Sequence, residues 1–428
     1  MVASFASLRR AVFGLRAAGL VAAGSAPASL REALVRARLR KLLRFSLQSV
    51  PAVQLKLTGV VNARALSLKE FPPTTRAELR QLPSLAHLST LVPGVTTLDA
   101  TSGSSGERLT VVRDELDTAI GDAIWMRTYA QLGWNPGMRR ARLRHPDPAT
   151  DHQPMRGLRA HLHLPQPVEI SSALPPEAQV NALLRYCPDL IHGSPFELAQ
   201  VCSELKRCRM RLAPHAVVCA GEPLHADVAA LIRDRLGVAP RSVYGTSEAG
   251  LVAWSCKRGR FHVNSDVVFV ELQSDGRDGR ANLLLTTLLR RAMPLIRFAP
   301  DDVVLSPDLN MRCGCGSAWP LLGEPLGSER SFLQLPDGTR VAERDVAAAL
   351  APFGGSHRYA LTQTDSQRVH VHAEAQVAAS NKKKRAVRHA LHRLVGGELS
   401  FTIEPVTNVP RGKTGKYALV RRTCGGFG

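Results

Sequence analysis

The hexapeptide TSGSSG, residues 101–106, combines hydroxyl side chains with two glycines. Glycine allows successive backbone N–H groups to turn toward one oxyanion, and serine hydroxyls add further donors. The segment is not a Walker-type P-loop, because no lysine followed by serine or threonine comes after its last glycine. Its composition is compatible with a phosphate cradle and equally with an ordinary flexible loop.

Three charged residues further along the chain stand in glycine-containing motifs or beside an apolar strand. Glu248 lies in YGTSEAG, Asp302 stands beside an apolar strand, and Lys416 lies in PRGKTGK. A nucleoside triphosphate with Mg²⁺ complements these groups, because N–H and hydroxyl donors hold phosphates and a carboxylate holds the hard cation. Glu248 would then bind Mg²⁺, Asp302 would accept from ribose hydroxyls, and Lys416 would neutralise charge during attack on the α-phosphate.

A separate set of residues has the donor chemistry of a structural metal site. Cys256 and His262 lie close in sequence, and Cys313 and Cys315 flank a glycine later in the chain. Three thiolates and one imidazole would complete the tetrahedral ligand set of zinc. The spacing is unusual for a zinc finger, so a zinc site and four ordinary packed or exposed side chains are both compatible with it.

Strands that alternate with helices must position these loops. Apolar strands are predicted near 190–191, 216–220 and 242–243, with a helix over 195–205 and another ending at residue 236 between them. Such alternation is typical of an α/β sheet whose ligands bind at the carboxyl ends of its strands. Residues 139–144 alternate arginine with apolar residues, which fits either a basic patch or one edge strand with a solvated face.

The remaining elements follow from apolar periodicity and capping signals. Helices are predicted over 114–131, 343–350 and 382–394, an antiparallel strand pair over 267–272 and 281–288, and strands over 368–373 and 401–406. Thr75 is placed to cap a helix that begins near Arg76. Residues 1–70 form a helical lead-in, because leucines recur there at three- to five-residue steps.

The chain length indicates two domains, since 428 residues exceed the size at which a single core stops growing. Glycine and proline concentrate between residues 314 and 331, where a boundary is expected. We therefore predict an N-terminal domain over 1–326, including the lead-in, and a small C-terminal domain over 327–428 that carries Lys416.

Composition argues against two function classes. The formal charge of +20 is spread along the chain and only 5% of residues are aromatic, so we expect no nucleic-acid partner. No run of eighteen uncharged apolar residues occurs, so no membrane span is expected. The eight cysteines indicate reduced thiols, and Arg16 interrupts the apolar stretch of a would-be signal peptide, which favours a cytoplasmic protein.

Five motifs in a fixed order now identify a resemblance. TSGSSG, AGEP, YGTSE, the strand ending at Asp302 and PRGKTGK together resemble the adenylate-forming superfamily, from about residue 70 to the end of the chain. FPPTTRAELR, LGWNPG and the Cys-Gly-Cys around residue 314 resemble its phenylacetate-CoA ligase-like branch, which includes coenzyme F390 synthetases. The resemblance implies an α/β fold: a large AMP-binding domain of layered sheets and helices, and a small mobile α+β lid.

The resemblance also implies roles for individual residues. The ATP phosphates would be contacted by Ser102, Gly103, Ser104, Ser105 and Gly106. The adenine would be bordered by Gly221, Glu222 and Pro223, with Tyr244 and Gly245 lying against its ring. Thr246 and Glu248 would serve phosphate and Mg²⁺, Asp302 would bind the ribose, and Lys416 would drive adenylation.

The activity so implied is a ligase reaction in two steps. ATP converts a small, by resemblance aromatic, carboxylic acid to an acyl-AMP, and the thiol of coenzyme A or of a carrier protein's phosphopantetheine then takes the acyl group. The protein would act as a monomer or homodimer. Two departures, Glu107 where the family has lysine and Ala299 where it has arginine, support an alternative: a catalytically weak nucleotide-binding scaffold of the same fold.

Overall fold

A computed structural model describes most of the chain. The described residues are 2–57, 67–81, 84–91, 97–100, 109–145, 163–274, 279–306, 312–412 and 415–423. They form two compact units: the first takes its residues from 2–135 and 243–324, and the second from 136–145, 163–242 and 325–423. Residues 136–145 and 163–242 thus group with the C-terminal residues, whereas the domain division expected from the sequence stays a prediction.

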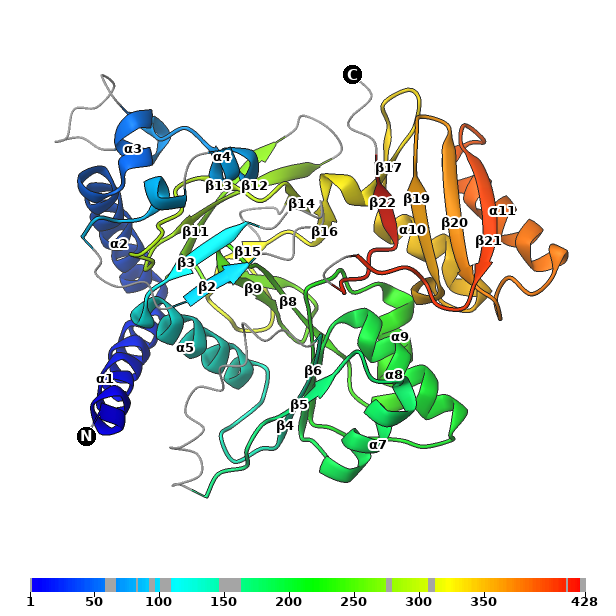
Figure 1. The fold of residues 1–428 in the computed structure, drawn as a ribbon, viewed down its shortest axis with the longest axis horizontal. Helices are drawn as coiled ribbons and strands as arrows, with labels where there is room; N and C mark the ends of the chain where they lie inside the picture. The colour runs from blue at the N-terminus through cyan, green and yellow to red at the C-terminus, as the bar shows by residue number, and fades with distance from the viewer. Residues whose placement is uncertain are drawn as a thin grey trace. The chain divides into compact units, whose positions relative to one another are not determined.

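The second unit begins with a layer of parallel strands. They run in the order β5-β4-β6-β7, with bounds Val168–Ser171 (β5), Arg140–Arg144 (β4), Leu190–Gly193 (β6) and Ala216–Ala220 (β7). Figure 1 shows the helices on one side of β4, β5 and β6: α7 (Pro176–Tyr186), α8 (Pro195–Arg207) and α9 (Ala226–Leu236). Leu198, Val217 and Ile232 are fully buried between the helices and the strands. The predicted alternation of strands and helices is confirmed.

One strand of this layer differs from its expected place. Strand β4 pairs with β5 on one side and with β6 on the other, so it is an internal strand and not an edge strand. Ala141 and Leu143 are fully or almost fully buried, while the three arginines that alternate with them along β4 are only partly buried. Periodicity reports which face of a strand is buried, but it carries no information on how many neighbours the strand has.

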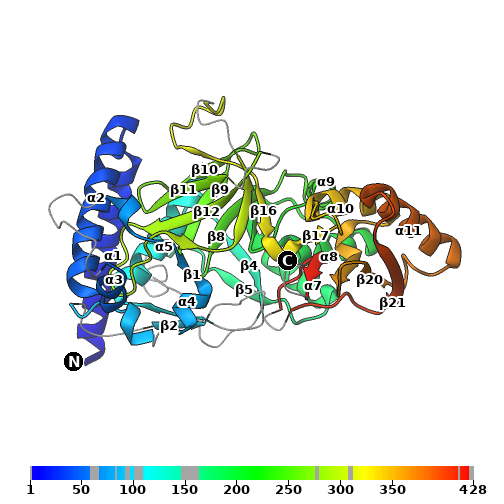
Figure 2. The same ribbon diagram turned by 90° about the horizontal axis from the view of Figure 1, so that it is seen from above.

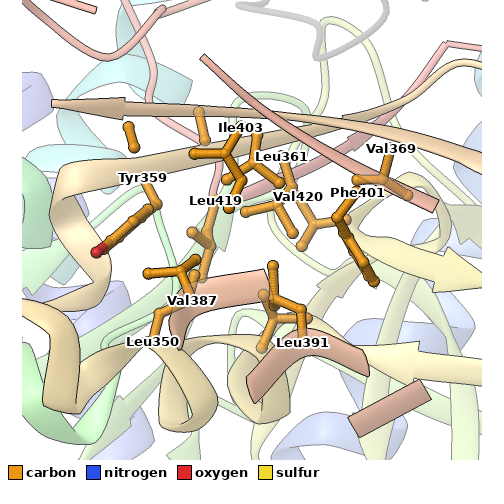
Figure 3. Packing of buried hydrophobic residues seen from close by; sticks show 14 of the residues in the cluster. Leu350, Tyr359, Leu361, Val369, Val387, Leu391, Phe401, Ile403, Leu419 and Val420 are labelled. Atoms are coloured by element: carbon orange, nitrogen blue, oxygen red, sulfur yellow. The ribbon is translucent and has the colours of Figure 1, made fainter. Parts of the chain in front are cut away.

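The C-terminal part of the second unit is an α+β layer. Its elements are β16 (Pro325–Ser328), β17 (Phe332–Gln334), β18 (Arg340–Ala342), α10 (Glu343–Leu350), β19 (Tyr359–Gln363), β20 (Arg368–Glu374), α11 (Asn381–Val395), β21 (Ser400–Val406) and β22 (Val420–Arg422). The order β21-β20-β19-β22 makes one four-stranded sheet. Figure 2 shows α10 and α11 against one face of it, and Figure 3 shows Tyr359, Val387 and Leu391 packed in the core between them.

The first unit contains sheets whose strands pair mostly antiparallel, with β1 (Thr74–Thr75) and β13 (Phe298–Ala299) as a parallel pair. One runs through β9 (Gly250–Ser255), β10 (Phe261–Val263), β15 (Leu321–Leu322) and the part of β8 (Arg241–Thr246) that belongs to this unit. The other contains β1, β13, β12 (Arg280–Thr287), β14 (Asp302–Leu305) and β11 (Val268–Ser274). Strands β11 and β12 pair antiparallel from Val268 opposite Thr287, as predicted. Strands β2 (Thr97–Ala100) and β3 (Thr110–Arg113) form a further antiparallel pair.

The helices of this unit largely follow the sequence pattern. They are α1 (Val2–Ala22), α2 (Ala28–Ser49), α3 (Pro51–Lys56), α4 (Arg76–Gln81) and α5 (Glu115–Gln131). Asp114 caps α5 by accepting the Asp117 N–H at 2.6 Å. The chain leaves α5 through Gly133, whose φ of +96° favours glycine. Among the described helices, none combines the length and the apolar character needed to cross a membrane.

The helical lead-in is tied to the strands through a buried carboxylate. Asp266 has no exposed surface, and Arg127 of α5 donates to both of its carboxylate oxygens at 2.8 and 2.9 Å. Arg38 of α2 donates to the Asp266 carbonyl at 2.6 Å. Because a buried charge is tolerated only when it is paired, these two arginines fix where the lead-in packs.

Candidate functional site

Two residues expected to hold a nucleotide are in direct contact in the first unit. The Tyr244 hydroxyl on β8 donates a hydrogen bond of 2.7 Å to Oδ2 of Asp302, the first residue of β14. Burial and the nearby Asp302 charge raise the pKa of Tyr244 well above its ordinary value, so the phenol stays protonated and remains a donor. Asp302 is thus oriented by the residue that would lie against the adenine.

The turn after Tyr244 requires glycine. A Cβ at Gly245 would lie 2.5 Å from the Gly250 carbonyl oxygen, because β8 and β9 are joined there through a register shift. Thr246 Oγ1 accepts the Ala249 N–H at 2.9 Å, which closes the turn. The oxygen of the Thr246 hydroxyl therefore already accepts one hydrogen bond within the turn. Toward a phosphate, the hydroxyl would act as a donor.

Glu248 is the buried carboxylate of this turn. It is 2% exposed, and Arg76 Nε, at the start of α4, donates to its Oε1 at 3.0 Å. Arg76 Nη2 lies 3.5 Å from Oε2, beyond the usual N–H···O range, so Oε2 keeps accepting capacity. Burial alone would lower the pKa of Arg76, but Glu248 and Asp302 outweigh burial and raise it, so the guanidinium stays charged.

A divalent cation fits this carboxylate in part. Mg²⁺ is bound in proteins through one or two carboxylates together with substrate phosphates, and the second oxygen of Glu248 offers such a ligand. The Arg76 guanidinium occupies the first oxygen, so cation and guanidinium would share the group.

Sequence reasoning missed the arginines around this turn. Arg290 Nη1 donates to the Glu248 carbonyl, and Arg113 Nη2 donates to the Ser247 carbonyl at 2.8 Å. Ala299 stands where the resembled family has an arginine. Thr75 pairs with Ala299 in the register of β1 and β13, and Arg76 is the next residue after Thr75. Arg76 is visible in the sequence motif FPPTTR, but the local sequence does not indicate that it pairs with a residue as far along the chain as Glu248.

The predicted phosphate loop lies outside the described residues. This applies to Ser102, Gly103, Ser104, Ser105 and Gly106, and to Glu107 after them. The strands on either side of the loop are described: β2 ends at Ala100 and β3 begins at Thr110, and these two residues pair.

The other expected nucleotide and catalytic residues belong to the second unit. Gly221 follows β7 with a φ of +87°, and Glu222 and Pro223 come next. Lys416 is exposed, and the N–H of the following Tyr417 donates to Glu222 Oε1 at 2.8 Å. The structure thus brings the predicted adenine loop and the predicted lysine segment together, through a tyrosine that sequence reasoning did not single out.

The four predicted zinc ligands converge at the end of the β9–β10 hairpin. The donor atoms of Cys256, His262, Cys313 and Cys315 all lie within 4.8 Å of one another. The sulfurs of Cys256 and Cys313 are 3.6 Å apart, and the Cys315 sulfur is 3.4 Å from His262 Nε2. A tetrahedral zinc with bonds of about 2.3 Å to sulfur sets ligand–ligand distances of about 3.8 Å, so the set fits that metal.

The surroundings of this cluster also suit a metal. His262 has no exposed surface, and its Nδ1 lies 3.0 Å from the Trp319 carbonyl, an arrangement that places the proton on Nδ1 and leaves Nε2 as the ligand atom. Burial raises the pKa of the Cys256 thiol, but hydrogen bonds from the backbone N–H groups of Arg258 and Arg260 outweigh burial, and the pKa falls to about 6. The thiolate form that binds zinc is therefore favoured.

Comparisons with known proteins show the fold. No protein-family model and no curated protein sequence matches the chain. Among solved structures, 2-hydroxyisobutyryl-CoA ligase in the postadenylation state with 2-HIB-AMP matches with a TM-score of 0.74, at 16% identity, over 92% of this chain and 90% of that chain. Its open conformation with 2-HIB-AMP and CoA matches with 0.61, at 15% identity, over 92% of each chain.

A second kind of ligase matches over a smaller part of the chain. The anthranilate CoA ligase AuaEII in complex with anthranoyl-AMP gives a TM-score of 0.55, at 14% identity, over 75% of this chain and 65% of that chain. The chain therefore has the fold of adenylate-forming enzymes, which confirms the fold expected from the ordered motifs. The narrower phenylacetate-CoA ligase-like branch stays a prediction.

Proposed function

We propose that this protein is an ATP-dependent acid–thiol ligase, which converts a small carboxylic acid to an acyl-AMP and then transfers the acyl group to a thiol. The observation that carries the proposal is the contact of Tyr244 with Asp302 beside the buried Glu248. A fold shared with CoA ligases that are described with acyl-AMP bound supports it. An intracellular supply of ATP and thiol fits the cytoplasmic location that we propose.

Each site residue has a distinct proposed task. Tyr244 would lie against the adenine, and Asp302 would accept from the ribose hydroxyls. Glu248 would hold Mg²⁺, which when bound neutralises phosphate charge. Lys416 would place a positive charge at the α-phosphate as the carboxylate attacks and pyrophosphate leaves, because stabilising developing charge is the main work of such a site.

The acid and the thiol acceptor are proposed by resemblance. The structural neighbours are described with one aliphatic hydroxy acid and one aromatic acid, so both chemistries belong in a substrate panel. We propose an aromatic acid first. The acceptor is coenzyme A or the phosphopantetheine of a carrier protein, and an acidic carrier would be attracted by the net charge of +20.

Pyrophosphate release from ATP and Mg²⁺ over a panel of aryl and aliphatic acids tests the proposal. We expect one acid to support release by the wild type, and Lys416→Ala to lower that release by roughly 100-fold or more. Lys382→Ala, at an exposed lysine of α11, is the matched control and should keep full activity. Release that is equal in both variants would contradict the role of Lys416.

The scaffold alternative makes a different prediction for the same assay. It rests on Ala299 and Glu107, which replace charged residues of the resembled family. ATP binding without pyrophosphate release for any acid would favour the scaffold. Acid-dependent release would exclude it, because a pure scaffold has no use for the attack on ATP.

A further inference from the structure

Glu222 joins two distant parts of the second unit through its carboxylate. Oε1 accepts the backbone N–H of Tyr417 at 2.8 Å, and Oε2 accepts the backbone N–H of Phe196 at 3.3 Å. Phe196 lies in the first turn of α8 and Tyr417 directly follows Lys416. One side chain thus connects the α/β layer with the segment that carries the lysine.

The backbone of Lys416 is held on both sides while its side chain is exposed. Its carbonyl accepts the Gly412 N–H at 2.8 Å and Arg421 Nη2 at 3.0 Å. The next peptide N–H, that of Tyr417, goes to Glu222. A flexible lysine with a fixed backbone is confined to a small region, which reduces the entropy lost when its ammonium group is positioned.

The Tyr417 side chain strengthens the same contact. Its ring stacks on Phe196 with centroids 4.4 Å apart, and its hydroxyl lies 2.6 Å from the Tyr359 carbonyl oxygen. Arg411 lies over the other ring of the pair, 4.8 Å from the Phe196 centroid. The lysine segment is therefore held against α8 in two ways: by the stacked rings of Tyr417 and Phe196, and by the two hydrogen bonds of the Glu222 carboxylate.

Two other carboxylates of the second unit, Asp227 and Glu343, bind backbone groups other than the Lys416–Tyr417 peptide. Asp227 accepts the N–H and hydroxyl of Ser356 at 2.6 and 2.9 Å, and Glu343 accepts the Leu419 N–H at 3.2 Å. Asp227 binds a residue far from the lysine in sequence, and Glu343 binds the backbone three residues after it. The peptide group that directly follows Lys416 donates its N–H to the carboxylate of Glu222, among the hydrogen bonds of the described residues.

From this geometry we infer that Glu222 is a positioning residue for Lys416, and that it acts by holding the Lys416–Tyr417 peptide against α8. The inference rests on the proposed function and deepens it. Glu222 would act in the adenylation step, where Lys416 is used. The transfer of the acyl group from an existing acyl-AMP to the thiol does not use Lys416 in our proposal, so that step should be independent of Glu222.

The variant Glu222→Gln tests this. Glutamine keeps the shape of the side chain but has one oxygen, so one of the two N–H donors faces an amide NH₂ group. We expect hydrogen exchange of the Tyr417 amide to become about 10-fold faster. We expect acid-dependent pyrophosphate release to fall roughly 10- to 100-fold, since misplacement by about 1 Å has such an effect. Thioester formation from preformed acyl-AMP should change less than about twofold.

Controls separate positioning from general damage. Glu177→Gln changes an exposed carboxylate of α7 in the same unit and should alter none of the three readouts. Glu222→Asp keeps both oxygens on a shorter side chain; it should lose the adenylation step selectively as well, and it replaces the glutamine variant if that one does not fold.

The outcomes that overturn the inference are distinct from failure of the proposed function. Unchanged exchange of the Tyr417 amide overturns it, and so does faster exchange with unchanged adenylation. An equal loss of both half-reactions overturns it too, because that indicates general destabilisation. If the wild type releases no pyrophosphate with any acid, the proposed function fails; the exchange measurement then decides alone whether Glu222 holds the lysine segment.

Discussion

Arg76 Nε lies 3.0 Å from Oε1 of Glu248, although the two residues are separated by 172 positions. The glutamate is 2% exposed, so its charge is compensated mainly by this arginine. The pair brings the start of α4 to the turn after β8, where Tyr244 and Asp302 also meet. It therefore links the stability of the first unit to the electrostatics of the candidate nucleotide site.

Removal of Arg76 should destabilise the protein. Arg76→Ala leaves a buried carboxylate unpaired, and we expect the free energy of unfolding to fall by roughly 2–4 kcal/mol. Glu248→Ala in addition should recover part of this loss, with a coupling energy of about 1–3 kcal/mol. Urea unfolding of the wild type, both single variants and the double variant measures the coupling, and strictly additive effects would contradict the pair.

Tyr244→Phe should separate the two tasks of the tyrosine. The ring remains for adenine, but the hydrogen bond to Asp302 is lost, so we expect stability to fall by about 1–2 kcal/mol. ATP affinity, measured by calorimetry, should change less than about threefold, whereas Asp302→Ala should weaken it at least about tenfold. A tenfold loss of affinity in Tyr244→Phe would show that the hydroxyl itself contacts the nucleotide or that Asp302 cannot act without it.

The cysteine and histidine cluster should bind one zinc ion per chain. We expect metal analysis of the purified protein to give a ratio near one, and Cys313→Ser to lower it. Chelation should lower the melting temperature by at least about 5 °C, because the ion binds the folded state. Cys187→Ser is the control, since Cys187 is exposed and lies in the second unit. Full zinc content in Cys313→Ser would contradict the site.

The stability of the protein should depend on pH through Glu222. Burial raises the pKa of Glu222 from 4.5 to about 7, against the opposing effect of the Tyr417 N–H. The folded state thus binds a proton more tightly than the unfolded state. This contribution to stability is fully present below pH 4.5 and is lost as the pH rises through 7.

The same variant isolates this effect. Between pH 5 and pH 8 the wild type should lose roughly 2–3 kcal/mol more of its free energy of unfolding than Glu222→Gln, which cannot titrate there. Urea unfolding of the wild type and of Glu222→Gln at both pH values gives the four free energies of unfolding that this comparison needs. Equal pH dependence of the two proteins would show that the pKa of Glu222 is not raised.

Local elements were the part of the fold that could be predicted. Helix α10 spans Glu343–Leu350 as expected, and β7 spans Ala216–Ala220 as expected. The Thr75 cap is confirmed, because Thr75 Oγ1 accepts the Glu78 N–H at 3.2 Å. These features depend on periodicity and capping within a few residues, and such information is complete in the local sequence.

Pairing between distant segments was not predictable in the same way. The internal place of β4 depends on which strands pair with it, and the partner of Arg76 depends on how α4 packs. The sequence indicated Glu248 and Asp302 as site residues by type and by position after strands. It did not indicate that a tyrosine would orient one of them and an arginine would neutralise the other.

The sequence by itself determined the order of the motifs, the residue types of the proposed nucleotide and zinc sites, and the local helices and strands, since each depends on neighbours along the chain. The tertiary structure decided that the sulfur and nitrogen atoms of Cys256, His262, Cys313 and Cys315 converge, and that Glu222 holds the peptide after Lys416. Both depend on long-range packing of buried surfaces, which sets distances between residues far apart in sequence.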